Sequence, residues 1–186
     1  MIIDKTTKRH DIIVLSGISG SGKTKLCSRI CHSRKNQGCD IAGILTLPFY
    51  QNGNKTQLIV ENIRSGECHL LANLTTTNKG AEIGKWRFNS EGLKKGLIAL
   101  KHSTPCDILV IDELGPLELI LGEGWFYALE LLKKVFYRQA LVVIRPRLLP
   151  EFYRFFPDLN LTTLMVTEET FDITFVKLDR LLGNTR

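Results

Sequence analysis

A glycine-rich segment, GISGSGKT at residues 17–24, lies directly between an apolar run and a stretch that is predicted to be helical. It matches the pattern G-x-x-x-x-G-K-[ST] at every position. Glycines let such a loop curl until successive backbone N–H groups converge, and a helix beginning at Gly22 adds the positive end of its dipole. The alternative is a glycine-rich turn that contains a lysine by chance. Such a turn would not need a strand before it or a helix after it. The segment therefore predicts a strand, loop and helix that bind phosphate groups.

The residues of this loop have separate expected roles. Lys23 should reach the β- and γ-phosphates of a nucleoside triphosphate, and the hydroxyl of Thr24 should ligate Mg²⁺. The residues expected to bind the nucleotide are Gly17, Ile18, Ser19, Gly20, Ser21, Gly22, Lys23 and Thr24. The sequence thus predicts Mg²⁺ as cofactor and ATP, GTP or another nucleoside triphosphate as substrate.

Short apolar runs alternate with helical patterns along most of the chain. Strands are predicted at 11–17, 41–47, 107–113, 140–144 and 161–167, and helices at 22–35, 89–102, 125–138 and 169–182, with a short helix near Pro150. This alternation predicts an α/β fold in three layers, with a mainly parallel sheet covered by helices on both faces. We expect one domain over residues 1–186, since no linker or repeat divides the chain.

Residues 48–74 have a different pattern, with alternating polar and apolar positions. The pairs Asn52-Gly53 and Ser65-Gly66 indicate two turns, so this segment is predicted to be an antiparallel β-meander of three short strands. It is best interpreted as an insertion at the edge of the sheet. The polar segment 75–85 is predicted to be a loop, followed by a brief strand at 86–88.

Two acids end DILVIDE, the most apolar strand candidate, at 107–113. Asp112 should hold Mg²⁺ through water, and Glu113 could polarise a water molecule for attack on the γ-phosphate. A solvated strand end is the alternative for this pair. Glu118 is a further candidate, balanced between a site residue and a surface residue. The predicted metal ligands are therefore Thr24 and Asp112.

The same segment contains DELG, which fits the D-x-x-G pattern of GTPases. A guanine-specific GTPase would also need an N-K-x-D loop to read the base. The Asn-Lys pairs at 54–55 and 78–79 are not followed by that aspartate. The sequence therefore disfavours a dedicated GTPase.

Arginines near the strand ends are candidates for stabilising the negative charge that develops on the γ-phosphate. Arg145 follows the strand predicted at 140–144, at the edge where ligands of open α/β sheets bind. Arg145 or Arg147 could contact the γ-phosphate, and a loop arginine paired with a surface acid is the alternative. Arg64 and Arg87, near the meander, are weaker candidates. Lys23, Glu113 and Arg145 are thus the predicted catalytic residues.

Composition and charge narrow the class of protein further. The formal net charge of +6 comes from dispersed basic residues without a long run, which does not favour nucleic-acid binding. The start, MIIDKTTKRHD, lacks the apolar centre of a signal peptide, and no apolar stretch is long enough to span a membrane. The five cysteines are expected to be reduced thiols. We therefore expect a cytoplasmic protein without a membrane segment.

The segments GISGSGKTKL, GILTLPF, GKWRFNSEGLKKGL and VIDELGPLEL together resemble the P-loop nucleoside-triphosphatase family, which includes thermophile enzymes and a human cancer-related nucleoside-triphosphatase. The resemblance runs from about residue 11 to residue 176. It implies a RecA-like sheet, with the strand after the acid pair inserted between the acid-bearing strand and the P-loop strand. It also implies slow hydrolysis of several nucleoside triphosphates with Mg²⁺ and loose base preference.

This resemblance also implies roles for particular positions. It places the phosphate loop on 17–24, the metal-proximal acid on Asp112, the water-activating acid on Glu113 and a later family acid on Glu118. The segment VVIRPRLLPEF resembles only part of the family, so it carries no role for Arg145.

Two other functions share these motifs. A small-molecule or nucleoside kinase would pass the phosphoryl group to a hydroxyl, and the meander with the following loop could supply its acceptor pocket and lid. A nucleotide-dependent switch would depend on a protein partner, for which the sequence shows no signature. Trp86, Trp125 or Tyr127 could stack on a base, although core packing is favoured for each.

Overall fold

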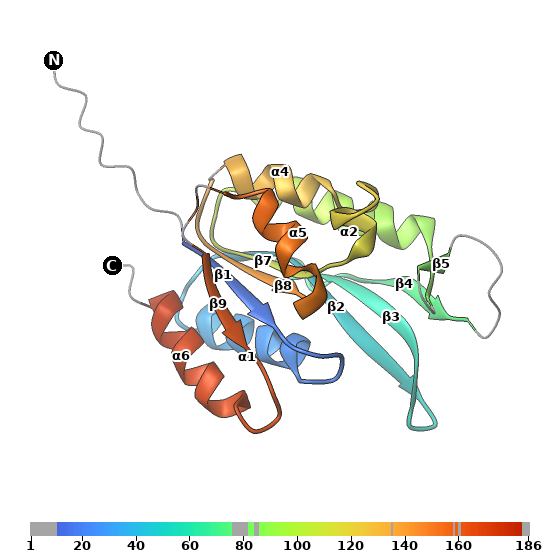
Figure 1. The fold of residues 1–186 in the computed structure, drawn as a ribbon, viewed down its shortest axis with the longest axis horizontal. Coiled ribbons are helices and arrows are strands. Elements are labelled where there is room, and N and C mark those ends of the chain that lie inside the picture. The colour runs from blue at the N-terminus through green and yellow to red at the C-terminus, as the bar shows by residue number, and fades with distance from the viewer. Residues whose placement is uncertain are drawn as a thin grey trace, which may run out of the picture.

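One continuous β-sheet organises the protein in the computed structural model, which describes residues 11–75, 82–83, 86–134, 136–157, 159 and 161–183 (Figure 1). Its strand order is β5-β6-β4-β3-β2-β7-β8-β1-β9. The strands are β1 (Asp11–Ser16), β2 (Ile41–Gln51), β3 (Asn54–Asn62), β4 (Cys68–Leu74), β5 (Glu82–Ile83), β6 (Trp86–Phe88), β7 (Cys106–Leu114), β8 (Tyr137–Ile144) and β9 (Leu161–Met165).

Helices cover both faces of the sheet (Figure 1). They are α1 (Lys23–Asn36), α2 (Ser90–Lys101), α3 (Pro116–Leu119), α4 (Tyr127–Lys134), α5 (Leu149–Arg154) and α6 (Phe171–Gly183), with a 3₁₀ turn at Pro146–Leu148. Helices α1 and α6 pack on one face, and α2, α4 and α5 pack on the other. The predicted three-layer α/β fold is confirmed.

Strand β1 shows how the two cores are built from one sequence. Ile12 and Val14 point into the core beneath α2, α4 and α5, whereas Ile13 and Leu15 point into the core against α1 and α6. All four side chains are buried, because both faces of a parallel sheet are covered by helices. The uninterrupted apolar run at 12–15 follows from this position in the sheet.

The parallel half of the sheet has the order that the resemblance implied. Strand β8 lies between β7, which carries the two acids, and β1, which leads into the glycine-rich loop. Strands β2 and β9 complete the parallel half, next to β7 and β1 respectively. The carboxyl ends of β1, β7 and β8 therefore lie at one edge of the sheet, where ligands of α/β proteins bind.

The antiparallel half is larger than a short edge insertion. Strand β2 does not end at Leu47 but continues to Gln51, turns at Asn52-Gly53 and pairs antiparallel with β3. Strands β4, β6 and β5 extend this half. The two predicted turns and the strand at 86–88 are confirmed. Most of the predicted loop at 75–85 lies outside the described residues, and its residues Glu82–Ile83 form β5.

Several boundaries differ from the predictions, among them the end of β9, at Met165 and not at residue 167, and the start of α4, at Tyr127 and not at residue 125. The helix predicted at 125–138 ends at Lys134, and the strand predicted to begin at residue 140 already begins at Tyr137. Tyr137 pairs with Cys106 of β7, and its hydroxyl donates a hydrogen bond to the Leu132 carbonyl at 2.6 Å. The sheet therefore extends into a segment whose sequence also suits a helix. Within the described ranges, no helix is both long and apolar enough to span a bilayer.

Candidate functional site

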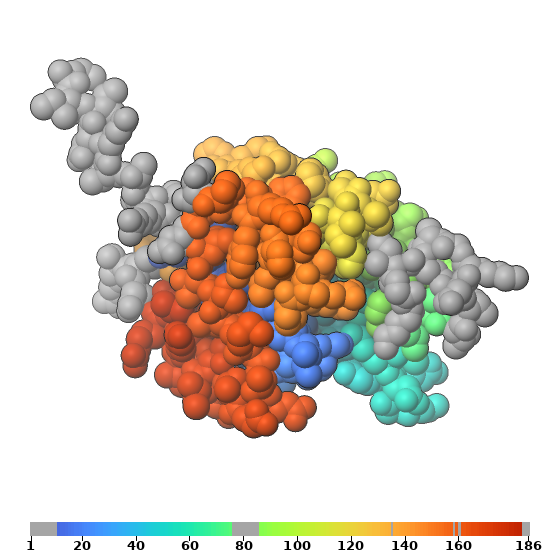
Figure 2. Space-filling view, in the orientation of Figure 1, coloured from blue at the N-terminus to red at the C-terminus, as the bar shows by residue number. Residues whose placement is uncertain are grey.

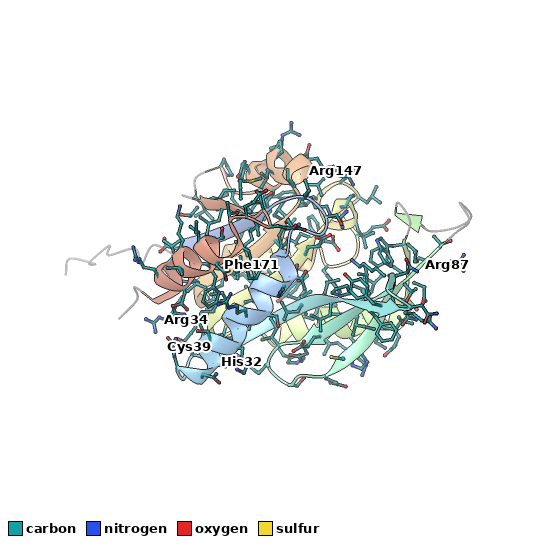
Figure 3. All side chains as sticks on the ribbon, turned by 90° about the horizontal axis from the view of Figure 1, so that it is seen from below. His32, Arg34, Cys39, Arg87, Arg147 and Phe171 are labelled. Atoms are coloured by element: carbon teal, nitrogen blue, oxygen red, sulfur yellow. The ribbon has the colours of Figure 1, made fainter. Side chains whose placement is uncertain are left out.

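The glycine-rich loop joins β1 to α1 in a conformation that depends on its glycines. Gly20 and Gly22 have positive φ angles of 88° and 92°, which favour glycine. At Gly17 a Cβ atom would lie 2.4 Å from the Val166 carbonyl oxygen, so a side chain is excluded. Gly22 lies beside the Phe171 ring, whose position next to α1 is visible in Figure 3. The loop is exposed between the C-terminal elements and the β2–β3 hairpin (Figure 2).

Lys23 is buried inside the curl of the loop. Its Nζ donates hydrogen bonds to the carbonyl oxygens of Gly17, at 2.8 Å, and Ile18, at 2.7 Å. Burial lowers the pKa of this amine, while the negative charge of Glu113 acts in the opposite direction. The charge is thus held at the centre of the loop, where the phosphate-binding pattern requires it.

Asp112 lies fully buried near the end of β7, next to β2. Its backbone carbonyl accepts a hydrogen bond from the Thr46 hydroxyl at 2.6 Å, and its Oδ2 accepts one from the Thr46 N–H at 3.4 Å. The pKa of Asp112 is raised to about 7, mainly by burial and secondly by the negative charge of Glu113. A hydrogen bond from the Thr24 hydroxyl acts in the opposite direction. Its other oxygen, Oδ1, is buried without a hydrogen-bond partner among the described residues.

This arrangement of oxygen atoms fits a magnesium ion. The Thr24 hydroxyl and the Asp112 carboxylate are hard oxygen donors, and Oδ1 of Asp112 needs a partner. The described residues contain no cluster of three His, Cys, Asp or Glu side chains that could hold a metal alone. Mg²⁺ does not need such a cluster, since it is usually bound by one or two protein groups together with substrate phosphates and water.

Glu113 and Arg145 form an ion pair across the ends of β7 and β8. Arg145 Nε donates to Glu113 Oε1 at 2.9 Å, and Arg145 Nη2 donates to the same oxygen. Both side chains are partly exposed. An arginine paired with an acid was the alternative interpretation of Arg145, and here the acid is the predicted water-activating residue itself.

A cavity of about 820 Å³ connects these groups. It extends from the glycine-rich loop along α1 to the β2–β3 hairpin. Its lining includes Ser19, Gly20, Gly22, Lys23, Thr24, Arg29, His32, Thr46, Tyr50, Lys55, Trp86, Asp112, Glu113 and Arg145. The structure therefore brings the predicted phosphate loop, acid pair and arginine to one cavity. Ile18 is exposed, and Gly17 and Ser21 support the loop beneath.

Glu118 is a buried structural residue that does not line this cavity. Its Oε2 accepts a hydrogen bond from the Gly115 N–H at 2.9 Å, and its Oε1 accepts one from the Trp125 N–H at 3.1 Å. Burial raises the pKa of its carboxyl group. Glu118 thus holds the turn after β7 against the segment that begins at Trp125.

Two weaker arginine candidates lie away from the cavity. Arg64 pairs with Asp40 at 2.8 Å and donates to the carbonyls of His102, Ser103 and Pro105, at the edge of the sheet opposite the glycine-rich loop. Arg87 is exposed on β6 and projects from the outer part of the meander (Figure 3).

Thr46 was missed as a site residue, whereas Trp86 was named only as a residue that could stack on a base, with core packing favoured. Thr46 reaches Asp112 because β2 pairs in parallel with β7, in a register that matches Ile44 with Ile111. Trp86 lines the cavity from β6, beneath the ammonium group of Lys55. A threonine at the end of a predicted strand was the only available signal for Thr46. Trp86 could be placed only by the antiparallel pairing.

The comparisons with known proteins agree with this geometry. The family model described as NTPase matches residues 12–177. The chain is similar to nucleoside-triphosphatase THEP1 of Methanosarcina barkeri, with 31% identity over 109 residues, and to that of Archaeoglobus fulgidus, with 31% identity over 107 residues. Each alignment covers 58% of this chain and 62% of the relative, which is less than two thirds of the relative's length.

Two solved structures share the fold. The solution structure of a human cancer-related nucleoside triphosphatase has a TM-score of 0.71 at 21% identity, covering 96% of this chain and 99% of that one. The crystal structure of THEP1 from Aquifex aeolicus has a TM-score of 0.68 at 18% identity, covering 93% of this chain and 99% of that one. The resemblance inferred from the sequence motifs is confirmed.

Proposed function

Because this chain belongs to the NTPase family, we propose that it is a Mg²⁺-dependent nucleoside triphosphatase that hydrolyses ATP, GTP and other nucleoside triphosphates to the diphosphate and phosphate. The observation that carries the proposal is the meeting of Lys23, Asp112, Glu113 and Arg145 in one cavity beside the glycine-rich loop. The names of the similar proteins support the same reaction class. We infer slow turnover with loose base preference, as the family resemblance implies.

The phosphate groups lie over the loop formed by residues 17–24 in this proposal. Backbone N–H groups of the loop and the N-terminal end of α1 bind the phosphate oxygens, and the Lys23 amine turns from the loop carbonyls to the β- and γ-phosphates. Thr24 and Asp112 would hold Mg²⁺, which would supply positive charge against the negative charge that develops on the phosphates.

The paired Glu113 and Arg145 act on the attacking water and the γ-phosphate. Arg145 binds Glu113 through Oε1, and among the described residues no hydrogen bond is made to Oε2. Glu113 Oε2 accepts a proton from the water molecule while the water oxygen attacks the γ-phosphorus, and the nucleoside diphosphate leaves. The Arg145 guanidinium orients the Glu113 carboxylate through its hydrogen bonds to Oε1, and it lies where it can also stabilise the charge of the transition state.

Phosphate release from several nucleoside triphosphates tests this function. We expect Lys23→Ala to abolish nucleotide binding and Glu113→Gln to lower turnover by about 10²–10⁴-fold while nucleotide still binds. Glu123→Gln removes the same charge from an exposed position and should hydrolyse at the wild-type rate. Wild-type turnover in Glu113→Gln would show that Glu113 is not the base.

A further inference from the structure

A second, smaller cavity adjoins the nucleotide cavity at the Glu113–Arg145 pair, which lines both. It has a volume of about 180 Å³, and it shares Thr46, Leu58, Trp86, Glu113 and Arg145 with the larger one. A hydrolase needs room for one attacking water, whose share of liquid volume is about 30 Å³, so this cavity could hold about six. Hydrolysis alone therefore does not explain its size.

The chemistry of this cavity favours an organic ligand. Trp86, Phe88, Leu93 and Trp125 contribute aromatic and aliphatic surface. The Trp125 ring is held in place, because its Nε1–H donates to the Leu93 carbonyl at 2.9 Å. A rigid apolar wall with a few polar groups is typical of pockets that bind small molecules.

Charged groups lie at three places around this apolar wall. One is Glu118, whose two carboxylate oxygens already accept hydrogen bonds from the backbone N–H groups of Gly115 and Trp125. The Glu113–Arg145 pair is shared with the nucleotide cavity, so a group bound there faces the γ-phosphate position of the proposed function. Arg147 also lines the cavity but is exposed, and it has no ion pair within the described ranges. An anionic group on the ligand would be complementary to Arg147.

We propose that this cavity binds a one-ring, hydroxyl-bearing organic anion and that the protein transfers the γ-phosphoryl group to its hydroxyl. The inference rests on the proposed nucleotide site. The hydroxyl oxygen attacks the γ-phosphorus, the bond between that phosphorus and the bridging oxygen breaks, and the nucleoside diphosphate leaves. Glu113 Oε2 takes the hydroxyl proton and returns it to solvent, which gives a phosphate monoester and a nucleoside diphosphate.

The two tryptophans of the chain provide a binding signal, because both line this cavity. The probe is 4-(hydroxymethyl)benzoate, which joins a ring to a hydroxyl and a carboxylate, and 4-methylbenzoate is the control that lacks the hydroxyl. With Mg²⁺ and ATP present, we expect both compounds to change tryptophan emission saturably in the millimolar range. Only the alcohol should give a phosphate monoester, detected by ³¹P NMR.

Matched variants locate the binding site. Leu93→Phe fills the cavity and should weaken probe binding by about tenfold or more. Leu97→Phe makes the same change one turn later on α2, outside the cavity lining, and should bind the probe as wild type does. Arg147→Ala, at an exposed position, should weaken binding of the anion, and Glu113→Gln should abolish monoester formation while the probe still binds.

Formation of nucleoside diphosphate, measured in the same samples, separates this inference from the proposed function. Protein that forms diphosphate but shows no emission change with either compound would overturn the ligand site. Saturable binding without monoester would overturn the transfer step. Folded protein that forms no diphosphate from any nucleoside triphosphate, with or without probe, would instead contradict the proposed function.

Discussion

At the scale of single residues, Asp112 links the site to the stability of the fold. Its carboxyl has a pKa of about 7 in the folded protein, compared with an ordinary value of 3.8, mainly because it is buried. Between these two values the folded protein binds more protons than the unfolded chain. The free energy of unfolding should therefore fall as the pH rises through this interval, and the loss is complete above pH 7.

Asp112→Asn removes this titration. In EDTA, we expect the wild-type melting temperature to fall from about pH 5 to about pH 8 and that of Asp112→Asn to fall less. Glu123→Gln, which removes an exposed carboxylate, should follow the wild-type curve. Thermal unfolding followed by circular dichroism measures all three proteins, and parallel curves for wild type and Asp112→Asn would contradict the raised pKa.

Gly43 is a residue whose importance comes from close packing of two strands. It has a φ angle of 117°, and a Cβ atom there would lie 1.9 Å from the Val110 carbonyl oxygen. Gly43→Ala should therefore force β2 away from β7 and cost more than about 3 kcal/mol. Gly53→Ala is a matched control, because Gly53 also has a positive φ of 76° but open space around it. Equal losses of stability for the two variants in urea unfolding would show that the positive φ angle alone, and not the contact with Val110, determines the cost.

The sequence predicted those site residues whose chemistry is local. The loop at 17–24 and the pair Asp112–Glu113 are contiguous motifs next to apolar strands, so their meeting followed from the parallel topology. Thr46 reaches Asp112 only through the register of β2 against β7, which no local pattern encodes. Glu118 lies in the mostly apolar segment LGPLELIL, and only the packing shows that its carboxylate accepts hydrogen bonds from two backbone N–H groups.

At the scale of secondary-structure elements, helix α2 approaches the neighbouring segment at a glycine. A Cβ atom at Gly96 would lie 2.5 Å from the Trp125 ring. Alanine is favoured over glycine inside a helix by about 1 kcal/mol, so a helix free of contacts would gain stability from Gly96→Ala. Here we expect a net loss, because the ring is wedged between α2 and the core and its N–H is bound to Leu93.

Urea unfolding of Gly96→Ala measures the sign of this effect. We expect a lower free energy of unfolding and, in a Trp86→Phe background, a shift in the emission of Trp125 as the ring moves. Lys94→Ala changes an exposed position of the same helix and should leave the emission unchanged. A more stable Gly96→Ala protein with unchanged emission would mean that the added methyl group does not displace the Trp125 ring and costs no stability.

Element boundaries were less predictable than element types. The helix at α4 was predicted to continue to residue 138, but the chain enters β8 at Tyr137, where it pairs with Cys106 of β7. Likewise, the strand predicted at 41–47 continues as β2 to Gln51, because it pairs antiparallel with β3 in a hairpin. In both places, tertiary pairing overrides the local preference.

At the scale of the whole molecule, the sheet separates two cores, and the cysteines report on both. Cys27 and Cys31 lie on the buried face of α1, and Cys106 is buried on the other face of the sheet. Burial raises the pKa of Cys31 and Cys106 to about 12 and raises that of Cys27 as well. Cys68 is exposed on β4, and Cys39 is half-buried after α1.

Alkylation at pH 8 tests whether both cores stay closed as one unit. Since the thiolate is the reactive form, a thiol with a pKa of about 12 has only about 10⁻⁴ of its molecules reactive at this pH. Iodoacetamide followed by peptide mass spectrometry should therefore label Cys68 first and Cys39 next. Cys27, Cys31 and Cys106 should react together, at the rate of global unfolding, because one sheet carries both cores. Labelling of Cys106 well before Cys27 and Cys31 would instead show that the core under α2 and α4 opens on its own.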